Sequence, residues 1–278
     1  MRFIFILTLF LIVFLQWTIA APKKTAKERN QAKLLEAQEA ESLIYSLQNT
    51  LYDRDCIWFC ELELFPYRGE KSSYDCIYYG SDSNKKVRLI LLPNKNLQNR
   101  SEYLFHIGKE SFIWDFSNGS ALPVPETHWT RELIPNVNIT PFDLLRPFVY
   151  WSKFEYLGPS QLKSRPVQTF KMYRPKNKNT NTPNIVEIAI DDDFKYPVEF
   201  NFYQNNQRLK RWKMLNIKKI QNNWIPKIID ITDELARNKV RFRVKEAAMN
   251  LKLPGYMFQP EQMTREIPLI KSMAFDKL

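Results

Sequence analysis

The chain has 278 residues, a formal net charge of +11, 44% hydrophobic residues and only six glycines. This hydrophobic content excludes a disordered chain, and the glycines lie too far apart to form a phosphate-binding loop. Neither a His-Glu-x-x-His nor a Gly-x-Ser-x-Gly motif occurs, which excludes the signatures of zinc proteases and serine hydrolases.

The first twenty residues predict a secretory signal peptide. A positive start at Arg2 precedes the apolar run Phe3–Leu15, and small residues close the segment at Ala20. The run is shorter than the roughly 20 residues that cross a bilayer comfortably. We therefore expect residues 1–20 to direct export and residues 21–278 to form one domain. An uncleaved membrane anchor is the alternative.

Residues 23–51 predict an amphipathic helix, because Ala40, Leu43, Ile44 and Leu47 recur at three- and four-residue steps. After this segment the hydrophobic period changes to two, which is typical of half-buried strands. Ten strands are expected, over residues 56–65, 74–80, 87–92, 111–116, 167–173, 185–190, 198–203, 209–217, 225–231 and 239–245. This series predicts a large, curved antiparallel sheet of about ten or eleven strands.

Residues 121–158 carry five prolines and interrupt the strand series. Thr140, Pro141 and Asp143 form a capping-box pattern, which predicts a short helix from Pro141 toward Tyr150 that is strained or ended near Pro147. One face of this helix is apolar and is the predicted lid face: Phe142, Leu145, Phe148 and Trp151. A movable lid and a permanent plug of the sheet both fit this insertion.

Three cysteines occur at positions 56, 60 and 76. Cys56 and Cys60 lie about 13 Å apart on one extended strand, too far for a direct bond. A hairpin centred on Arg68 places Cys60 opposite Cys76, so we expect a Cys60–Cys76 disulfide with Cys56 buried and free. A Cys56–Cys76 bridge and three reduced thiols are the alternatives. No His or second cysteine pair completes a four-ligand site, and we expect no metal.

The alternation places one set of mainly aromatic side chains on the inner faces of the strands: Trp58, Leu62, Leu64, Tyr78, Phe112, Trp114, Phe200 and Phe202. A sheet that curves without closing leaves an apolar trough there, although these residues also suit a solid core. The basic stretch 208–219, with Trp212, is either an approach to anionic headgroups or an exposed sheet face. The run Asp191–Asp193 precedes a turn, and a solvated turn is preferred to a metal or acid–base cluster. We therefore expect no enzymatic activity, no cofactor and no nucleic-acid partner.

Several motifs follow one another in a familiar order: Thr140-Pro141-Phe142-Asp143-Leu144-Leu145, Tyr150-Trp151, Tyr156-Leu157-Gly158, Tyr196-Pro197-Val198 and Trp224-Ile225-Pro226-Lys227. The chain thereby resembles the bacterial outer-membrane lipoprotein-sorting proteins, the LolA-like superfamily, in an uncharacterised branch. The resemblance covers residues 30–265. It implies an α+β fold in which a strongly curved antiparallel sheet, an incomplete β-barrel, has its concave side covered by an N-terminal helix and a helical insertion.

The same resemblance implies a periplasmic carrier or chaperone that binds the acyl chains of lipids or lipoproteins in its trough, with an envelope membrane or protein as a further partner. The sequence does not indicate the oligomeric state. The alternative is a secreted envelope scaffold with a filled core, which binds its partner through a basic face.

Overall fold

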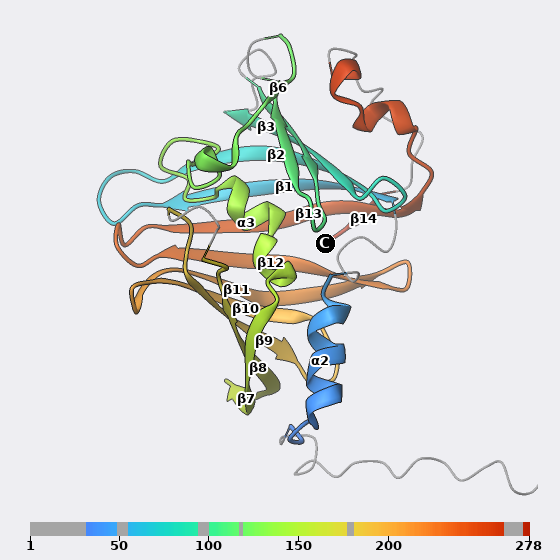
Figure 1. Cartoon of the computed structure of the whole chain (residues 1–278). Coiled ribbons are helices and arrows are strands. Elements are labelled where there is room, and N and C mark those ends of the chain that lie inside the picture. Colours follow the sequence, from blue (N-terminus) through green and yellow to red (C-terminus); the bar gives the residue numbers. More distant parts are fainter. Residues whose placement is uncertain (1–31, 49–54, 94–99, 117–118, 177–180, 264–274) are drawn as a thin grey trace, which may run out of the picture.

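The computed structural model describes residues 32–48, 55–93, 100–116, 119–176, 181–263 and 275–278. They form a 14-stranded sheet in which every pair of neighbouring strands is antiparallel (Figure 1). The strand order is β6-β5-β4-β3-β2-β1-β13-β12-β11-β10-β9-β8-β7, and β14 pairs with β13. The curved antiparallel sheet predicted from the sequence is thus present.

The strands are β1 Asp55–Phe65, β2 Ser72–Ser81, β3 Lys86–Pro93, β4 Ser101–His106, β5 Phe112–Asp115, β6 Leu122–Pro123, β7 Lys153–Leu162, β8 Arg165–Tyr173, β9 Ile185–Asp191, β10 Pro197–Gln204, β11 Gln207–Ile220, β12 Asn223–Asp233, β13 Lys239–Leu251 and β14 Asp276–Lys277. The expected count of ten or eleven is too low, because β4, β6, β7 and β14 were not predicted. Two of these have only two residues, and β7 begins within the predicted insertion 121–158.

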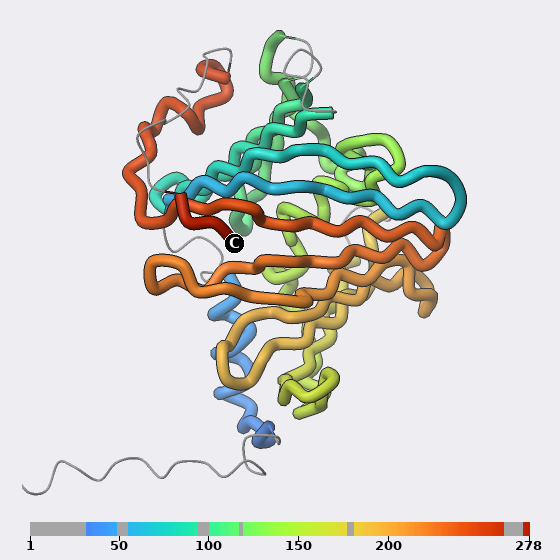
Figure 2. Tube along the Cα trace, turned by 180° about the vertical axis from the view of Figure 1, so that it is seen from behind, coloured from blue at the N-terminus to red at the C-terminus, as the bar shows by residue number. Residues whose placement is uncertain are grey.

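The sheet curves strongly and carries its α-helices on one face, as the front and rear views show (Figures 1 and 2). Strands β6 and β7 end the strand order without pairing to each other. The barrel is therefore incomplete, and the segment 124–152 connects its two edges in sequence.

Helix α2 spans Ala37–Ser46 and is shorter than the predicted helix over residues 23–51. Residues 32–36 are not helical, and the remaining parts of the prediction, 23–31 and 49–51, lie outside the described residues. The predicted apolar face is confirmed, because Ala40, Leu43, Ile44 and Leu47 are all buried. The side-chain amide of Gln48 donates to the carbonyl oxygen of Val149 at 3.0 Å, which joins this helix to the insertion.

Helix α3 spans Pro141–Leu145, and the 3₁₀ helix η5 spans Pro147–Tyr150. The capping box is confirmed: the Thr140 side chain accepts from the Asp143 amide, and the Asp143 carboxylate accepts from the Thr140 amide. Arg146 between the helices has a φ of 49°, in the left-handed region. The α-helix thus ends at Leu145, two residues before Pro147, in agreement with the expected end near this proline, because proline disfavours helical backbone at the preceding residue.

Buried side chains form two cores on opposite faces of the sheet. Val87, Leu89 and Leu91 of β3 belong to the concave core, whereas Ile90 and Leu92 belong to the convex core. The convex core is completed by the segment 253–263, which contains the 3₁₀ helices η6 Gly255–Phe258 and η7 Pro260–Gln262; a third, η4, spans Glu126–His128. Within the described part of the chain, no helix is both long and apolar enough to cross a membrane.

Candidate functional site

A cavity of about 170 Å³ lies between the concave face of the sheet and the segment 133–146; we refer to it as the chamber. Its sheet walls come from strands β1–β4 and β10–β13, and its other wall comes from the insertion. The side chains that form it are mostly apolar: Trp58, Leu62, Cys76, Tyr78, Val87, Leu89, Leu91, Phe105, Ile107, Leu133, Ile134, Val137, Ile139, Asp143, Leu144, Arg146, Tyr196, Pro197, Val198, Phe200, Trp212, Lys213, Met214, Pro226, Ile229, Ile231 and Phe242.

Four of the eight predicted trough residues line the chamber, namely Trp58, Leu62, Tyr78 and Phe200. The rings of Trp58 and Tyr78 stack across β1 and β2 with their centroids 4.6 Å apart. Leu64 and Phe202 belong to the surrounding concave core without lining the cavity.

The other two predicted trough residues, Phe112 and Trp114, lie elsewhere. On β5 it is Ile113 that belongs to the concave core, and strand alternation directs its neighbours to the opposite face. Trp114 packs against the convex core, and the side chain of Phe112 is 51% exposed. The prediction of an inward face was wrong for this strand, because the larger aromatic residues were assigned to the inside.

The predicted lid residues Phe142, Leu145, Phe148 and Trp151 are all buried, but none of them lines the chamber. The ring of Phe148 lies 5.4 Å from that of Phe200 and 5.6 Å from that of Phe202. These residues therefore anchor the insertion to β10, and the cavity wall comes from other parts of the same segment.

A buried ion pair fastens the chamber wall to the sheet. Nζ of Lys210 on β11 lies 2.7 Å from Oδ2 of Asp143 on α3, and the two side chains are 10% and 2% exposed. The same carboxylate oxygen accepts hydrogen bonds from the amide and hydroxyl of Thr140, each at 2.8 Å. Asp143 thus serves two purposes, because it caps α3 and binds the sheet.

Several chamber residues were not predicted, including Leu144, Met214 and Ile229. The indole Nε1 of Trp212 is buried and has no hydrogen-bond partner among the described residues. Strand alternation in β11 could have predicted that Trp212 and Met214 both line the cavity, since these two residues share a face of the strand. The pairing of Lys210 with Asp143 had no local signal, because 67 positions separate the two residues.

The basic stretch 208–219 is not an open cationic surface. Arg208 pairs with Glu234 at 3.1 Å, and Lys213 pairs with Glu199 at 3.3 Å. Lys218 donates to the carbonyl oxygen of Lys277 at 2.8 Å. Most of the charge on this strand is therefore matched within the fold, including the cations of Arg208, Lys210, Arg211 and Lys213, whereas Lys219 near its end is exposed.

The predicted hairpin register of the cysteines is confirmed, because Cys60 and Cys76 are direct partners across β1 and β2. All three cysteines are nevertheless free, buried thiols, so the predicted disulfide is not present in the structure. Burial raises the pKa of Cys56 to about 12, and burial together with the Cys76 thiol raises the pKa of Cys60. Since the thiolate is the species that reacts with disulfides and oxidants, such thiols oxidise slowly.

The run Asp191–Asp193 forms the turn between β9 and β10. Oδ1 of Asp191 accepts from the amides of Asp193 and Phe194, both at 3.0 Å. The expected turn is confirmed, although Asp191 itself is buried. Over the described residues, no group of three or more His, Cys, Asp or Glu side chains could hold a metal ion.

Comparison with known proteins shows the fold. A domain of an outer-membrane lipoprotein-sorting protein from Vibrio parahaemolyticus is similar with a TM-score of 0.68 and 14% identity, over 81% of this chain and 100% of that one. A DUF1329 family protein from Desulfovibrio piger has a TM-score of 0.67 and 8% identity, over 80% and 96%. A LolA superfamily protein from Nitrosomonas europaea has a TM-score of 0.61 and 14% identity, over 79% and 97%.

A family model described as an uncharacterized protein matches residues 142–265, which is less than half of the chain. No curated protein matches the sequence. The similarity to solved structures therefore rests on shape, and the resemblance read from the order of the motifs is confirmed at the level of the fold. The chain has the LolA-like fold, with its candidate site between the curved sheet and the insertion.

Proposed function

We propose that the chain is a non-enzymatic periplasmic carrier that binds an acyl chain of a lipid or lipoprotein in the chamber. The observation that supports this proposal is the apolar cavity enclosed between the concave face of the LolA-like sheet and the segment 133–146. Its walls offer hydrocarbon contacts from Leu89, Phe105 and Ile229, and each methylene that moves from water into such a site contributes about 0.8 kcal/mol.

A ligand would be accommodated by moving the insertion away from the sheet, which enlarges the chamber. The Asp143–Lys210 pair is the charged contact that this movement breaks, whereas the aromatic anchor at Phe148 keeps the segment attached. In this role the insertion is a lid that is hinged at one side and fastened at the other. This arrangement supports the reversible burial on which a carrier depends.

The proposed location and cargo have separate support. The predicted signal peptide, which lies outside the described residues, agrees with export to the periplasm. A solved protein of the same fold is named as a domain of an outer-membrane lipoprotein-sorting protein. Outer-membrane lipoprotein sorting is accordingly the process in which we place this chain.

One observation favours a second candidate, an envelope scaffold with a filled core. The chamber volume of about 170 Å³ is below the roughly 300–1,000 Å³ of typical ligand sites. The rings of Phe142, Phe148 and Phe202 pack together in the concave core. Such a scaffold would bind its partner through charge, helped by the net +11 of the chain, and would hold no lipid.

Lipid analysis of the protein as it is recovered from cells distinguishes the two candidates. The carrier predicts a co-purifying acyl lipid in an organic extract, and saturable uptake of a fluorescent fatty acid that unlabelled palmitate displaces. A protein that is empty on extraction and takes up no probe would refute the carrier. Salt-sensitive capture of an envelope protein or polysaccharide by this empty protein would then establish the scaffold.

A further inference from the structure

A second cavity, of about 300 Å³, lies at the end of the sheet where the β9–β10 and β11–β12 turns meet; we refer to it as the end cavity. It shares six lining residues with the chamber, so the two cavities lie against the same side chains: Trp58, Tyr78, Tyr196, Val198, Met214 and Pro226. The end cavity is also lined by Arg165, Phe194 and Trp224. It therefore lies between the chamber and the surface.

Two exposed aromatic residues form the rim of the end cavity. Phe194 is 47% exposed and Trp224 is 48% exposed, and their rings meet edge to face with centroids 5.2 Å apart. Phe194 belongs to the β9–β10 turn, and Trp224 is the second residue of β12. A Trp beside a cavity mouth, half in water, is typical of the surfaces that enter the interface of a lipid bilayer.

Basic residues lie on the elements that carry this rim or next to them in the chain. Lys219 is exposed and is the cross-strand partner of Trp224. Lys163 is exposed in the turn between β7 and β8, and the side chain of Arg165 beside it is 37% exposed. These cations suit the negative surface of a bilayer that contains anionic phospholipids.

The carboxylates of the same rim are occupied within the fold. Asp191 pairs with Arg165 at 3.6 Å and accepts two turn amides. Asp192 pairs with Lys195 at 3.0 Å. Asp193 is the third carboxylate of the turn. The rim also carries two lysines, Lys163 and Lys219, so its lysines outnumber this one remaining carboxylate.

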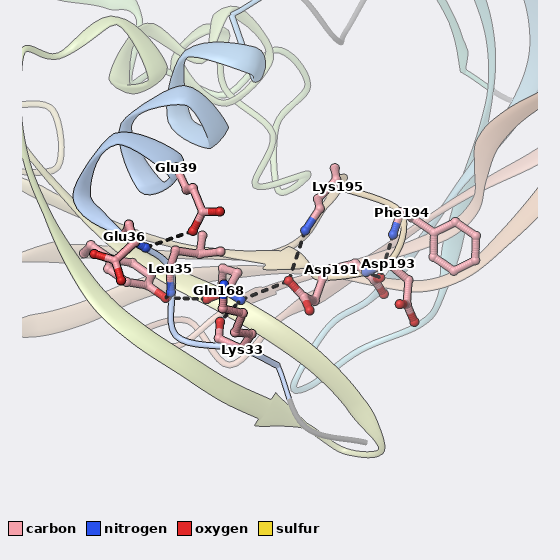
Figure 3. Close-up of polar contacts among 11 residues, drawn as sticks. Lys33, Leu35, Glu36, Glu39, Gln168, Asp191, Asp193, Phe194 and Lys195 are labelled. Carbon is pink, nitrogen blue, oxygen red and sulfur yellow. Dashed lines mark hydrogen bonds and ion pairs between the residues drawn. The ribbon is translucent and has the colours of Figure 1, made fainter. Parts of the chain in front are cut away.

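A hydrogen-bond network fixes the turn that carries Phe194. The Gln168 side-chain amide donates to the carbonyl oxygen of Lys33 at 2.8 Å and to Oδ1 of Asp192 at 2.9 Å. Figure 3 shows Gln168 between the segment at Lys33 and the turn with Phe194 and Lys195. The aromatic side chain is thus presented from a braced turn, which lowers the conformational cost of inserting it into another phase.

We propose that the rim formed by Lys163, Arg165, Phe194, Lys219 and Trp224 docks on the surface of an anionic phospholipid bilayer. An acyl chain then passes between the two aromatic rings into the end cavity and on to the chamber. The docking step stands on the exposed aromatic pair and its cations, whereas the passage of the acyl chain rests on the proposed carrier function.

Vesicle co-sedimentation tests the docking step. The full chain is expressed in a bacterial host, and the protein recovered from the soluble envelope fraction is mixed with phosphatidylglycerol–phosphatidylethanolamine vesicles. The variant Phe194→Ser/Trp224→Ser should lower the bound fraction at least about fivefold, and added salt should weaken wild-type binding. Phosphatidylcholine vesicles should bind weakly.

The matched control lies at the opposite end of the sheet. Tyr67 in the β1–β2 turn and Leu235 in the β12–β13 turn are each 58% exposed, and neither lines the end cavity. The variant Tyr67→Ser/Leu235→Ser should bind like the wild type. The proposal is overturned if the wild type does not bind anionic vesicles, if the rim variant binds as well as the wild type, or if the control variant loses as much binding.

Trp224→Phe separates insertion from a general loss of structure. This variant keeps an aromatic rim and should bind vesicles, but it should lose the fluorescence quenching that brominated acyl chains cause in the wild type. Quenching that persists in Trp224→Phe would assign the membrane contact to another tryptophan and would contradict the proposal.

A fatty acid probe distinguishes failure of the rim from failure of the carrier. The rim variant Phe194→Ser/Trp224→Ser should extract a fluorescent fatty acid from vesicles more slowly than the wild type, whereas the control variant Tyr67→Ser/Leu235→Ser should extract it at the wild-type rate. A wild type that binds vesicles without taking up any probe would refute the carrier and leave membrane docking in place. Equal extraction rates for wild type and rim variant would refute passage through the rim.

Discussion

The two faces of strands β2–β4 are covered in different ways. On the convex face the segment 253–263 is held by Arg88, which pairs with Glu102 and donates to the carbonyl oxygens of Met257 and Met263 at 3.1 and 3.0 Å. On the concave face the insertion is held by Lys210, whose described partner is Asp143. One buried cation thus holds three groups in place, and the other holds one.

On the proposed function, this difference separates a permanent cover from a lid. The convex core contains Leu104, Met257 and Phe258, all fully buried, and none of them lines the chamber or the end cavity. The concave cover forms one wall of the chamber, and its polar contacts with the sheet include the Asp143–Lys210 pair, the Asn138–Asp233 hydrogen bond and the hydrogen bond from the Tyr103 hydroxyl to the Leu133 carbonyl oxygen. Leu144, next to the ion pair, is half-buried at the cavity wall.

The largest effect is expected on the convex side. Arg88→Ala should lower the free energy of unfolding by about 3–5 kcal/mol, because it leaves the buried carboxylate of Glu102 with only the partly exposed Arg100 at 3.6 Å. Burial already raises the pKa of this carboxyl. Fluorescent fatty acid uptake by the folded fraction should remain unchanged, as Arg88 does not line the chamber. Denaturant unfolding and probe titration measure the two effects.

Arg243→Ala is the matched control, because Arg243 pairs with Glu63 at 3.2 Å where both side chains are about one third exposed. Its loss should cost less than about 1 kcal/mol. Equal losses in the two variants would contradict the distinction between a buried anchor and an exposed pair.

Lys210→Met should have the next largest effect and should loosen the lid. The free energy of unfolding should fall by about 3 kcal/mol. This is at the low end for a broken buried ion pair, because Asp143 keeps its two hydrogen-bond donors from Thr140. Hydrogen exchange at Leu144 and Arg146 should accelerate, and bound probe should dissociate faster. Lys171→Met, which removes a partly exposed partner of Glu187, serves as the control. Unchanged exchange in Lys210→Met would show that the pair does not hold the lid.

The local parts of this arrangement were predictable from the sequence. The capping box at Thr140 and Asp143 and the register of Cys60 with Cys76 depend on residues close together in the chain, and both are confirmed. The alternation of β1 placed Trp58 and Leu62 correctly because that strand has polar residues on its other face.

The inward face of β5 could not be predicted in the same way. Phe112, Ile113 and Trp114 are all large and apolar, so alternation alone does not reveal which face is inside. The packing of Ile113 in the concave core decides it. Likewise, the partner of Lys210 depends on how the insertion folds back over β11, which is a tertiary contact without any pattern in the sequence.

A substitution that fills the chamber should weaken ligand binding while leaving the fold intact. Leu144→Trp should lower the affinity for a fluorescent fatty acid at least about tenfold, equivalent to about 1.4 kcal/mol, because the larger side chain enters the cavity that Leu144 lines. Phe112→Ala should leave the affinity unchanged, since Phe112 lies outside the chamber. Weaker binding in Phe112→Ala would instead restore the original prediction for β5.

The smallest effect concerns alkaline pH. Burial raises the pKa of Cys56 from 9.0 to about 12, so the folded chain keeps a proton that the unfolded chain releases. The resulting stability is present below pH 9 and is lost as the pH rises toward 12. At pH 9.5 Cys56 should account for a loss of about 0.8 kcal/mol in the free energy of unfolding relative to pH 7. The free energy of unfolding of Cys56→Ala should therefore decline by that much less between pH 7 and pH 9.5. An identical decline would show that the thiol is not shielded.

Photo-crosslinking with a palmitate that carries a diazirine tests the central claim most directly, because it reports where an acyl chain lies. We predict saturable labelling, competed by unlabelled palmitate, at chamber residues such as Leu144, Trp212 and Met214. Absent labelling, or labelling confined to exposed positions such as Phe112, would contradict an acyl-binding chamber.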